Sequence, residues 1–248
     1  LLSLDGAWRG VLEPYDWNLW KENYINKMVE MASLMEEWGA NGVCIGSEMR
    51  FMEDDLSLMK ELFTEVRKVF SGVVIYNANW DALYNEATWR SVKRIARMSD
   101  WFAISFYMPL SLSENATISQ LKLSWRAIKS LLVTRAMEAG RKILFYEVGY
   151  RSILGAARKP YEWGVTYPES QEEQEKCFKS LIESLSNEFW FKGLFVWAEE
   201  VEPEGLGAKF VYDGYDVVGK LAEKVFLDYF QGDVPNAKLH AKDGTLIL

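Results

Sequence analysis

The chain has 248 residues, 49% of them hydrophobic and 26% charged, which is the balance of a globular protein with a sizeable core. Asp and Glu number 36 against 28 Lys and Arg, and the formal net charge of −8 repels a polyanion, so we exclude nucleic acid as a partner. No apolar run approaches the roughly 20 residues of a membrane helix, so no membrane partner is expected.

The sequence offers little histidine or cysteine chemistry. The single histidine, His240, excludes a zinc site built on histidines and leaves almost no support for a His-dependent triad. Cys44 and Cys177 lie far apart, in apolar stretches that suit buried free thiols. We therefore expect neither a metal nor a cofactor. Carboxylates, tyrosines and tryptophans remain as the candidate functional groups.

Short β-rich apolar runs alternate with longer stretches in which apolar residues recur three and four positions apart. Such alternation predicts a parallel sheet with right-handed crossovers. In chain order, we predict a strand at 1–4, a helix at 20–38, a strand at 42–47, a helix at 54–69, a strand at 73–78, a helix at 86–97, a strand at 101–106, a helix at 118–139, a strand at 142–147, a helix at 171–188, a strand at 194–197 and a helix at 216–230.

The links between these elements differ in length. Helix-to-strand links are short and mostly contain glycine, whereas strand-to-helix links are longer and hold much of the aromatic and acidic content. In parallel α/β folds the functional face lies at the C-terminal ends of the strands. We therefore expect the site in the strand-to-helix links, at 5–16, 48–53, 77–85, 107–117, 148–170 and 198–215.

Two glutamates end predicted strands, Glu48 in Cys-Ile-Gly-Ser-Glu and Glu147 in Ile-Leu-Phe-Tyr-Glu. The sequence between them has room for three further strand–helix units, so we expect the two carboxyls to face each other across the mouth of a barrel. Retaining glycosidases need two carboxyls roughly 5 Å apart, one to attack the anomeric carbon and one to protonate the leaving oxygen. The alternative is that each glutamate is a structural ion-pair or helix-capping residue.

Several segments resemble glycoside hydrolase family 113, a clan A family best known for endo-β-1,4-mannanases. The resemblance extends from Trp8 to about Phe230, and its most specific element is Glu-Val-Gly-Tyr-Arg-Ser. The matching segments are Ile-Gly-Ser-Glu at 45–48, Tyr-Asn-Ala-Asn-Trp-Asp at 76–81, Glu-Val-Gly-Tyr-Arg-Ser at 147–152, and Trp-Phe-Lys-Gly at 190–193 followed by Trp197.

The resemblance implies a (β/α)₈ barrel in which Glu48 ends strand four as the acid/base and Glu147 ends strand seven as the nucleophile. It also implies that Tyr107, after strand six, hydrogen-bonds the nucleophile and that Trp197, after strand eight, forms the floor under the reacting sugar. These roles are physically reasonable, because a sugar presents a C–H face to an aromatic ring and a hydroxyl donor favours an ionised carboxylate.

Further candidates for substrate binding lie in the same links. Asn79 and Trp80 suit contacts with sugar hydroxyls and ring faces, or else are a turn asparagine and a packing tryptophan. Trp8 and Arg9 follow the first predicted strand, and Arg9 could equally form a structural ion pair. Tyr150, on the long link after residue 148, suits either a sugar contact or loop packing.

The predicted elements amount to six strand–helix units, whereas a barrel needs eight. On the family pattern the units are strands three to eight, with the first two absent, and an open sheet of six strands would leave unpaired edges. We therefore predict a catalytic barrel domain at 1–230, completed by an N-terminal segment or a partner. Residues 231–248 form a C-terminal extension in which Asp-Gly favours a β-hairpin.

The leading interpretation is an endo-acting retaining hydrolase of β-1,4-linked mannan or glucomannan that works by double displacement without a cofactor. Ser47 stands where many clan A enzymes carry the asparagine that binds the sugar 2-hydroxyl, which leaves the manno versus gluco preference open. The alternatives are a clan A hydrolase of another β-glycan and a non-catalytic barrel that binds glycan. Two strand-end carboxylates argue against the last, since binding alone needs neither.

Overall fold

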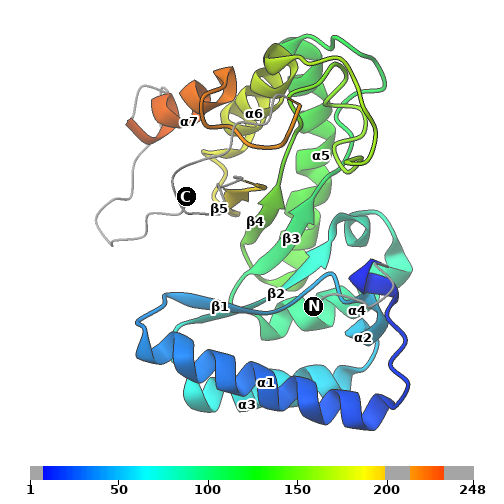
Figure 1. The fold of residues 1–248 in the computed structure, drawn as a ribbon, viewed down its shortest axis with the longest axis vertical. Coiled ribbons are helices and arrows are strands. Elements are labelled where there is room, and N and C mark those ends of the chain that lie inside the picture. The colour runs from blue at the N-terminus through cyan, green and yellow to red at the C-terminus, as the bar shows by residue number, and fades with distance from the viewer. Residues whose placement is uncertain (1–7, 199–212, 232–248) are drawn as a thin grey trace. The chain divides into compact units, whose positions relative to one another are not determined.

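The computed structural model describes residues 8–198 and 213–231 (Figure 1). Within these ranges, five strands form one sheet in the order β1-β2-β3-β4-β5. The chain divides into two compact units, unit 1 with residues 1–105 and 133–144 and unit 2 with residues 106–132 and 145–248, which we describe separately. The strand predicted at 1–4 and the hairpin predicted within 231–248 lie outside the described residues.

Unit 1 consists of parallel strands and the helices that pack on them. β1 pairs with β2, and β2 with β3, in parallel register. Its elements are η1 (Arg9–Val11), α1 (Trp17–Glu37), β1 (Gly42–Ser47), α2 (Arg50–Glu53), α3 (Leu56–Val69), β2 (Val73–Asn79), η2 (Trp80–Leu83), α4 (Glu86–Met98) and most of β3 (Phe102–Phe106), with the last part of α5 (Ile118–Ala139) and the start of β4 (Ile143–Val148).

Unit 2 holds the remainder of α5 and β4, together with α6 (Gln171–Leu185), β5 (Phe191–Val196) and α7 (Leu221–Gln231). Aromatic rings fill its core: Phe106 stacks on Phe145 with centroids 4.4 Å apart, and on Trp125 at 5.2 Å. The Trp125 indole N–H donates to the Ser180 hydroxyl on α6 at 3.2 Å, which satisfies a buried donor. Helices α6 and α7 lie side by side (Figure 1).

Local sequence explains where the helices begin. Asp16 and Asp55 each accept a backbone N–H from the first turn of α1 and α3, and Asn85 and Ser170 do the same for α4 and α6. Such caps satisfy N–H groups that have no partner inside the helix. After α1 the chain passes through Gly39 at a φ of +70°, a conformation that glycine adopts without strain.

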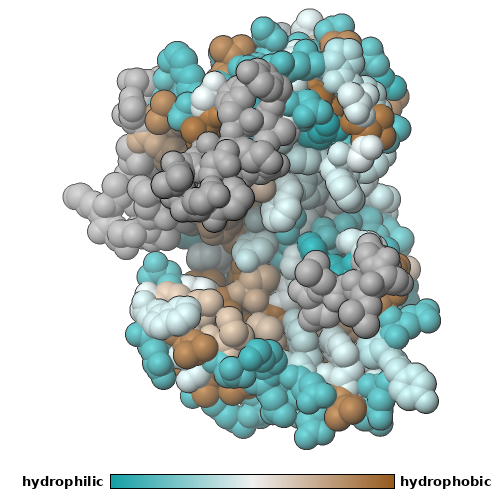
Figure 2. Space-filling model, viewed as in Figure 1, coloured by the Kyte–Doolittle hydropathy of each residue, from teal (hydrophilic) through white to brown (hydrophobic). Residues whose placement is uncertain are grey.

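The core of unit 1 lies between its sheet and its helices. Every residue of β3 is buried, as are the five central residues of β2, which is expected of parallel strands covered on both faces. On α3, Leu58, Leu62, Phe63 and Val66 are buried along one face. Helices α1 and α3 lie side by side, and Figure 2 shows mostly hydrophilic residues over their outer surface.

The predicted elements are confirmed over the described residues, with differences at some ends. β1 to β4 match their predicted runs to within one residue at each end. β5 begins at Phe191, three residues earlier than predicted. Gly193, which the sequence pattern assigns to the link before the strand, lies within the strand. α7 begins at Leu221 instead of 216, since a turn precedes it.

The end of α2 carries a buried carboxyl. Glu53 is only 4% exposed, and its Oε1 accepts a hydrogen bond of 2.9 Å from the Tyr76 hydroxyl. Burial raises the pKa of Glu53 to about 7, because the carboxylate loses its hydration. The hydrogen bond from Tyr76 and the charge of Arg50 offset part of this rise, whereas Asp81 and Asp54 add to it.

We predict that Glu53→Gln gains stability relative to the wild type as the pH rises from 4.5 to 7. An unfolded Glu titrates near 4.5, so over this range the unfolded chain releases a proton that the folded chain retains. The contribution of Glu53 to stability is therefore complete below pH 4.5 and is lost as the pH rises through about 7. The difference in unfolding free energy should shift by about 3 kcal/mol in favour of the variant.

Urea unfolding of both proteins at a series of pH values measures this difference. Glu61→Gln, at an exposed position of α3, is the matched control for the loss of a glutamate from the same unit. A difference between Glu53→Gln and the wild type that does not change with pH would contradict the raised pKa of Glu53.

Candidate active site

Glu48 follows the last residue of β1, at the C-terminal end of the strand. Its φ of 54° lies in the left-handed region, which residues other than glycine seldom adopt. Its N–H donates to the carbonyl of Asn77 on β2 at 2.7 Å, and the register between the two strands shifts between Cys44 and Ser47. The chain thus leaves the regular strand just before Glu48 while remaining bonded to the sheet.

The Glu48 carboxyl accepts hydrogen bonds from three of the residues predicted from the sequence. Its Oε2 accepts from Trp8 Nε1 and from Arg9 Nη2, each at 3.1 Å, and its Oε1 accepts from Asn79 Nδ2 at 3.1 Å. Glu48 is only 7% exposed. The ion pair considered for Arg9 therefore exists, and its partner is Glu48. All three donors fix the orientation of one carboxyl.

A second layer of polar groups supports this arrangement. Arg9 Nε donates to the Ser47 carbonyl at 2.9 Å, while Asn77 Nδ2 donates to the hydroxyls of Ser47 and Ser105, each at 2.8 Å. No sequence motif singles out Asn77. Strand alternation was the available signal, because residues two apart on a strand share a face and Asn77 precedes Asn79 by two.

Trp80 begins the short turn η2 directly after β2. Its ring tilts against that of Tyr84, with centroids 5.4 Å apart. The next residue, Asp81, forms an ion pair with Arg50. Trp80 therefore directly follows Asn79, which donates to Glu48, and its ring packs against Tyr84 at the end of η2.

The other predicted residues belong to unit 2. Glu147 is half-buried near the end of β4, and the Trp197 N–H donates to the neighbouring Val148 carbonyl at 2.9 Å. Gly149 leaves room for this approach, since a Cβ there would lie 2.3 Å from the Trp197 carbonyl oxygen and 2.8 Å from Cδ1 of Tyr215. Trp197 is 46% exposed.

Tyr215 also belongs to this region and is not among the residues predicted from the sequence. Its ring meets that of Tyr107, which directly follows β3, edge to face at 6.4 Å. Its hydroxyl donates to the Pro160 carbonyl at 2.6 Å, and burial raises its pKa to about 12. The only signal in the sequence was an aromatic residue at the end of the predicted link 198–215.

Tyr150 requires a correction, because its side chain is fully buried at 0% exposure and packs edge-on against Phe178 at 5.2 Å. A buried ring cannot stack on a sugar, so the loop-packing alternative describes Tyr150. The adjacent Arg151 anchors the long link by donating to the Asp213 carboxylate at 2.7 Å and to the Val165 carbonyl at 2.6 Å.

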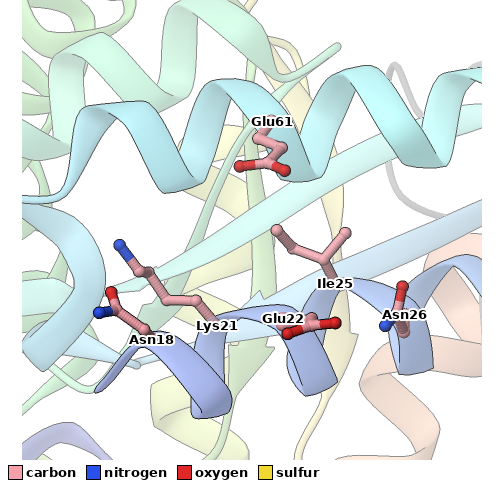
Figure 3. Close-up of a pocket in the computed structure, with 6 residues that line it drawn as sticks. All are labelled: Asn18, Lys21, Glu22, Ile25, Asn26 and Glu61. Atoms are coloured by element: carbon pink, nitrogen blue, oxygen red, sulfur yellow. The ribbon is translucent and has the colours of Figure 1, made fainter. Parts of the chain in front are cut away.

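A shallow cleft of about 220 Å³ lies between α1 and α3 (Figure 3). It contains none of the residues predicted to act in the site, and Lys21 in it pairs with Asp55. We assign it no function. Its lining residues are Asn18, Lys21, Glu22, Ile25, Asn26 and Glu61.

Two further properties concern the described residues alone. Among them, no group of three or more His, Cys, Asp or Glu side chains is arranged to hold a metal ion. No helix in the ranges 8–198 and 213–231 has the length and apolar content needed to cross a membrane.

Comparisons with known proteins bear on this arrangement. The β-mannanase of Alicyclobacillus acidocaldarius, solved in complex with ManMIm, is 24% identical with a TM-score of 0.72, over 92% of this chain and 70% of that one. A GH113 β-1,4-mannanase, also solved as a complex, is 25% identical with a TM-score of 0.67, again over 92% of this chain and 70% of that chain. A Faecalibacterium prausnitzii β-glucuronidase shares the fold alone, at 17% identity and a TM-score of 0.59 over 87% of this chain and 35% of that chain.

These likenesses confirm the predicted fold class, with the described strands forming part of a (β/α)₈ barrel. No curated protein matches the chain. The sequence model of Glycoside Hydrolase Family 113 matches residues 3–220, which is most of the chain. The chain therefore belongs to glycoside hydrolase family 113.

Proposed function

We propose that this glycoside hydrolase cleaves β-1,4-linked mannan or glucomannan with retention of configuration, using Glu48 as the acid/base and Glu147 as the nucleophile. The observation that carries the proposal is the convergence of Trp8, Arg9 and Asn79 on the Glu48 carboxyl at the end of a barrel strand. Membership of the family and the similarity to solved β-mannanases support the substrate class.

In the first step, a carboxylate oxygen of Glu147 attacks the anomeric carbon while Glu48 protonates the departing glycosidic oxygen. Glu48 Oε2 accepts two donors, whereas Oε1 accepts Asn79 alone, so Oε1 has the room for the proton that the acid must carry. In the second step, Glu48 removes a proton from water, and the resulting oxygen nucleophile releases the sugar from Glu147. The mechanism requires the two carboxyls to lie about 5 Å apart.

Aromatic side chains would supply the contacts with the sugar rings. Trp197 follows β5 and exposes nearly half of its surface, as a stacking platform requires. Tyr107 lies after β3 against Tyr215, which positions its ring in unit 2 close to the end of β4. We propose that Trp197 underlies the reacting sugar and that Tyr107 donates to Glu147.

Replacement of either proposed catalytic glutamate by glutamine should lower kcat by about three orders of magnitude or more, because the amide can neither attack nor transfer the proton. Initial rates on mannan, together with thermal unfolding to confirm folding, measure the effect. Glu61→Gln on α3 is the control and should retain wild-type turnover. A 2-deoxy-2-fluoro-mannoside should label Glu147 covalently, and label on another residue would remove its assignment as nucleophile.

The substrate class is tested by incubating the enzyme in parallel with mannan, glucomannan, xylan and cellulose and measuring reducing-sugar release. We expect release from the first two and at most a few per cent of that rate from the others. Faster release from xylan or cellulose would assign the enzyme to another β-glycan. Binding without release from any of the four would indicate a non-catalytic glycan-binding protein.

Trp197→Ala should lower kcat/KM for mannan by about tenfold to a hundredfold, since it removes the proposed stacking surface while leaving the fold intact. Trp38→Ala is the matched control, because that ring is also exposed, at 71%, but follows α1. Steady-state kinetics of both variants decide the matter. Equal kinetic effects would show that Trp197 has no special role.

A further inference from the structure

The backbone at Glu48 is held in an unfavourable conformation by hydrogen bonds on both sides. With a φ of 54°, this residue adopts the left-handed region without being glycine. The N–H of Glu48 donates to the Asn77 carbonyl at 2.7 Å, and the N–H of the next residue, Met49, donates to the Tyr76 hydroxyl oxygen at 3.0 Å. The peptide groups that flank the Glu48 Cα are thus both fixed by β2.

Tyr76 reaches Met49 because Gly46 leaves space for its ring. A Cβ at Gly46 would lie 2.9 Å from Cε2 of Tyr76 and 3.1 Å from Cε of Met52. Any larger residue at this position of β1 would therefore displace the ring. The glycine of the Ile-Gly-Ser-Glu segment thus allows the hydroxyl of Tyr76 to meet the chain just beyond Glu48.

Glu53 orients the Tyr76 hydroxyl. A tyrosine hydroxyl has one proton to donate, and Tyr76 donates it to Glu53 Oε1 at 2.9 Å. Its oxygen lone pair then points toward the N–H of Met49 and accepts from it. Tyr76, Met49 and Glu53 are all buried, so water cannot replace a lost partner in this chain of hydrogen bonds.

We propose that Tyr76 and Glu53 are positioning residues for Glu48, holding its backbone in the conformation from which its carboxyl meets Trp8, Arg9 and Asn79. This inference rests on the acid/base role proposed for Glu48. Both residues act through the N–H of Met49 and contact no substrate. The energy that this buried chain supplies is what keeps a left-handed glutamate at the end of β1.

The charges around Glu53 make the chain sensitive to pH. Arg50 and Asp54 lie on or beside α2, Asp81 lies on η2, and Tyr24 of α1 faces Tyr76. Burial raises the pKa of Glu53 to about 7, so its carboxyl ionises near neutrality. An ionised carboxylate accepts a shorter and stronger hydrogen bond than a neutral one, so Tyr76 is held most firmly above that pH.

The test compares three variants by steady-state kinetics on mannan from pH 5 to pH 8. Tyr76→Phe leaves the Met49 N–H without its acceptor and should lower kcat about tenfold while KM stays within about twofold. Glu53→Leu removes the acceptor of the Tyr76 proton and should behave in the same way. Glu53→Gln keeps an acceptor and should retain kcat at pH 5 to within about threefold, while losing the ionisation near pH 7 from the kcat profile.

Trp89→Phe is the matched structural control. It removes a part-buried hydrogen bond to a glutamate in the same unit, from the buried Trp89 Nε1–H to Glu138 Oε2, and should reduce stability without changing kcat. Labelling with the 2-fluoro-mannoside gives the fraction of folded, reactive enzyme, so that kcat is calculated per active molecule. If Tyr76→Phe does not fold, the dependence of kcat on pH in Glu53→Gln still tests the positioning role.

The two proposals fail in distinguishable ways. If Glu48→Gln abolishes turnover but Tyr76→Phe has wild-type kcat, or Glu53→Gln keeps the wild-type pH profile, the positioning role is wrong and the proposed function stands. If Glu48→Gln retains turnover, the acid/base assignment fails, and the positioning role fails with it.

Discussion

The hydrogen bonds that converge on the Glu48 carboxyl are the interaction on which the arrangement of this site depends. They join two segments distant in sequence, because Trp8 and Arg9 lie at η1 while Asn79 ends β2. A buried carboxyl without partners would be costly, and here each oxygen has at least one donor. The hydrogen bonds therefore both orient the Glu48 carboxyl and attach the segment before α1 to the end of the sheet.

The parallel sheet explains why so few residues suffice to build such a cluster. Each strand delivers its last residues to the same edge, and the register between β1 and β2 pairs Ser47 with Asn77. Glu48 and Asn79 then follow on neighbouring strand ends, Glu48 after a register shift and with a left-handed φ of 54°. In unit 2, Glu147 lies near the end of β4 and Trp197 just after β5.

The sequence predicted much of this fold, for identifiable physical reasons. Buried parallel strands are largely apolar, so four of the five described strands stood out as short runs between polar or glycine-bearing links. The start of β5 was misplaced because Gly193 is usual in turns but here lies within a strand. Strand-end positions also predicted that Glu48 and Asn79 are neighbours, because the topology of unit 1 brings the ends of β1 and β2 to one edge.

The remaining parts of the site depend on long-range packing that no local pattern encodes. Tyr150 and Tyr215 both lie in long links and look alike in sequence, yet the first is buried against Phe178 and the second meets Tyr107. The surroundings of each ring are decided by distant residues, Phe178 on α6 for Tyr150 and Tyr107 just after β3 for Tyr215. Asn77 escaped notice for a related reason, since its role requires hydroxyls from two adjacent strands.

The absence of a side chain at Gly149 has a consequence for protein engineering. The Trp197 carbonyl oxygen occupies the place that a Cβ at position 149 would fill, so the backbones that follow β4 and β5 pack directly against each other at that point. A chimera that takes one of these segments from a relative and keeps the other would mismatch two backbones, which have no rotamers with which to adjust. Exchange of the two segments together preserves the fit, so they form a single cassette for recombination.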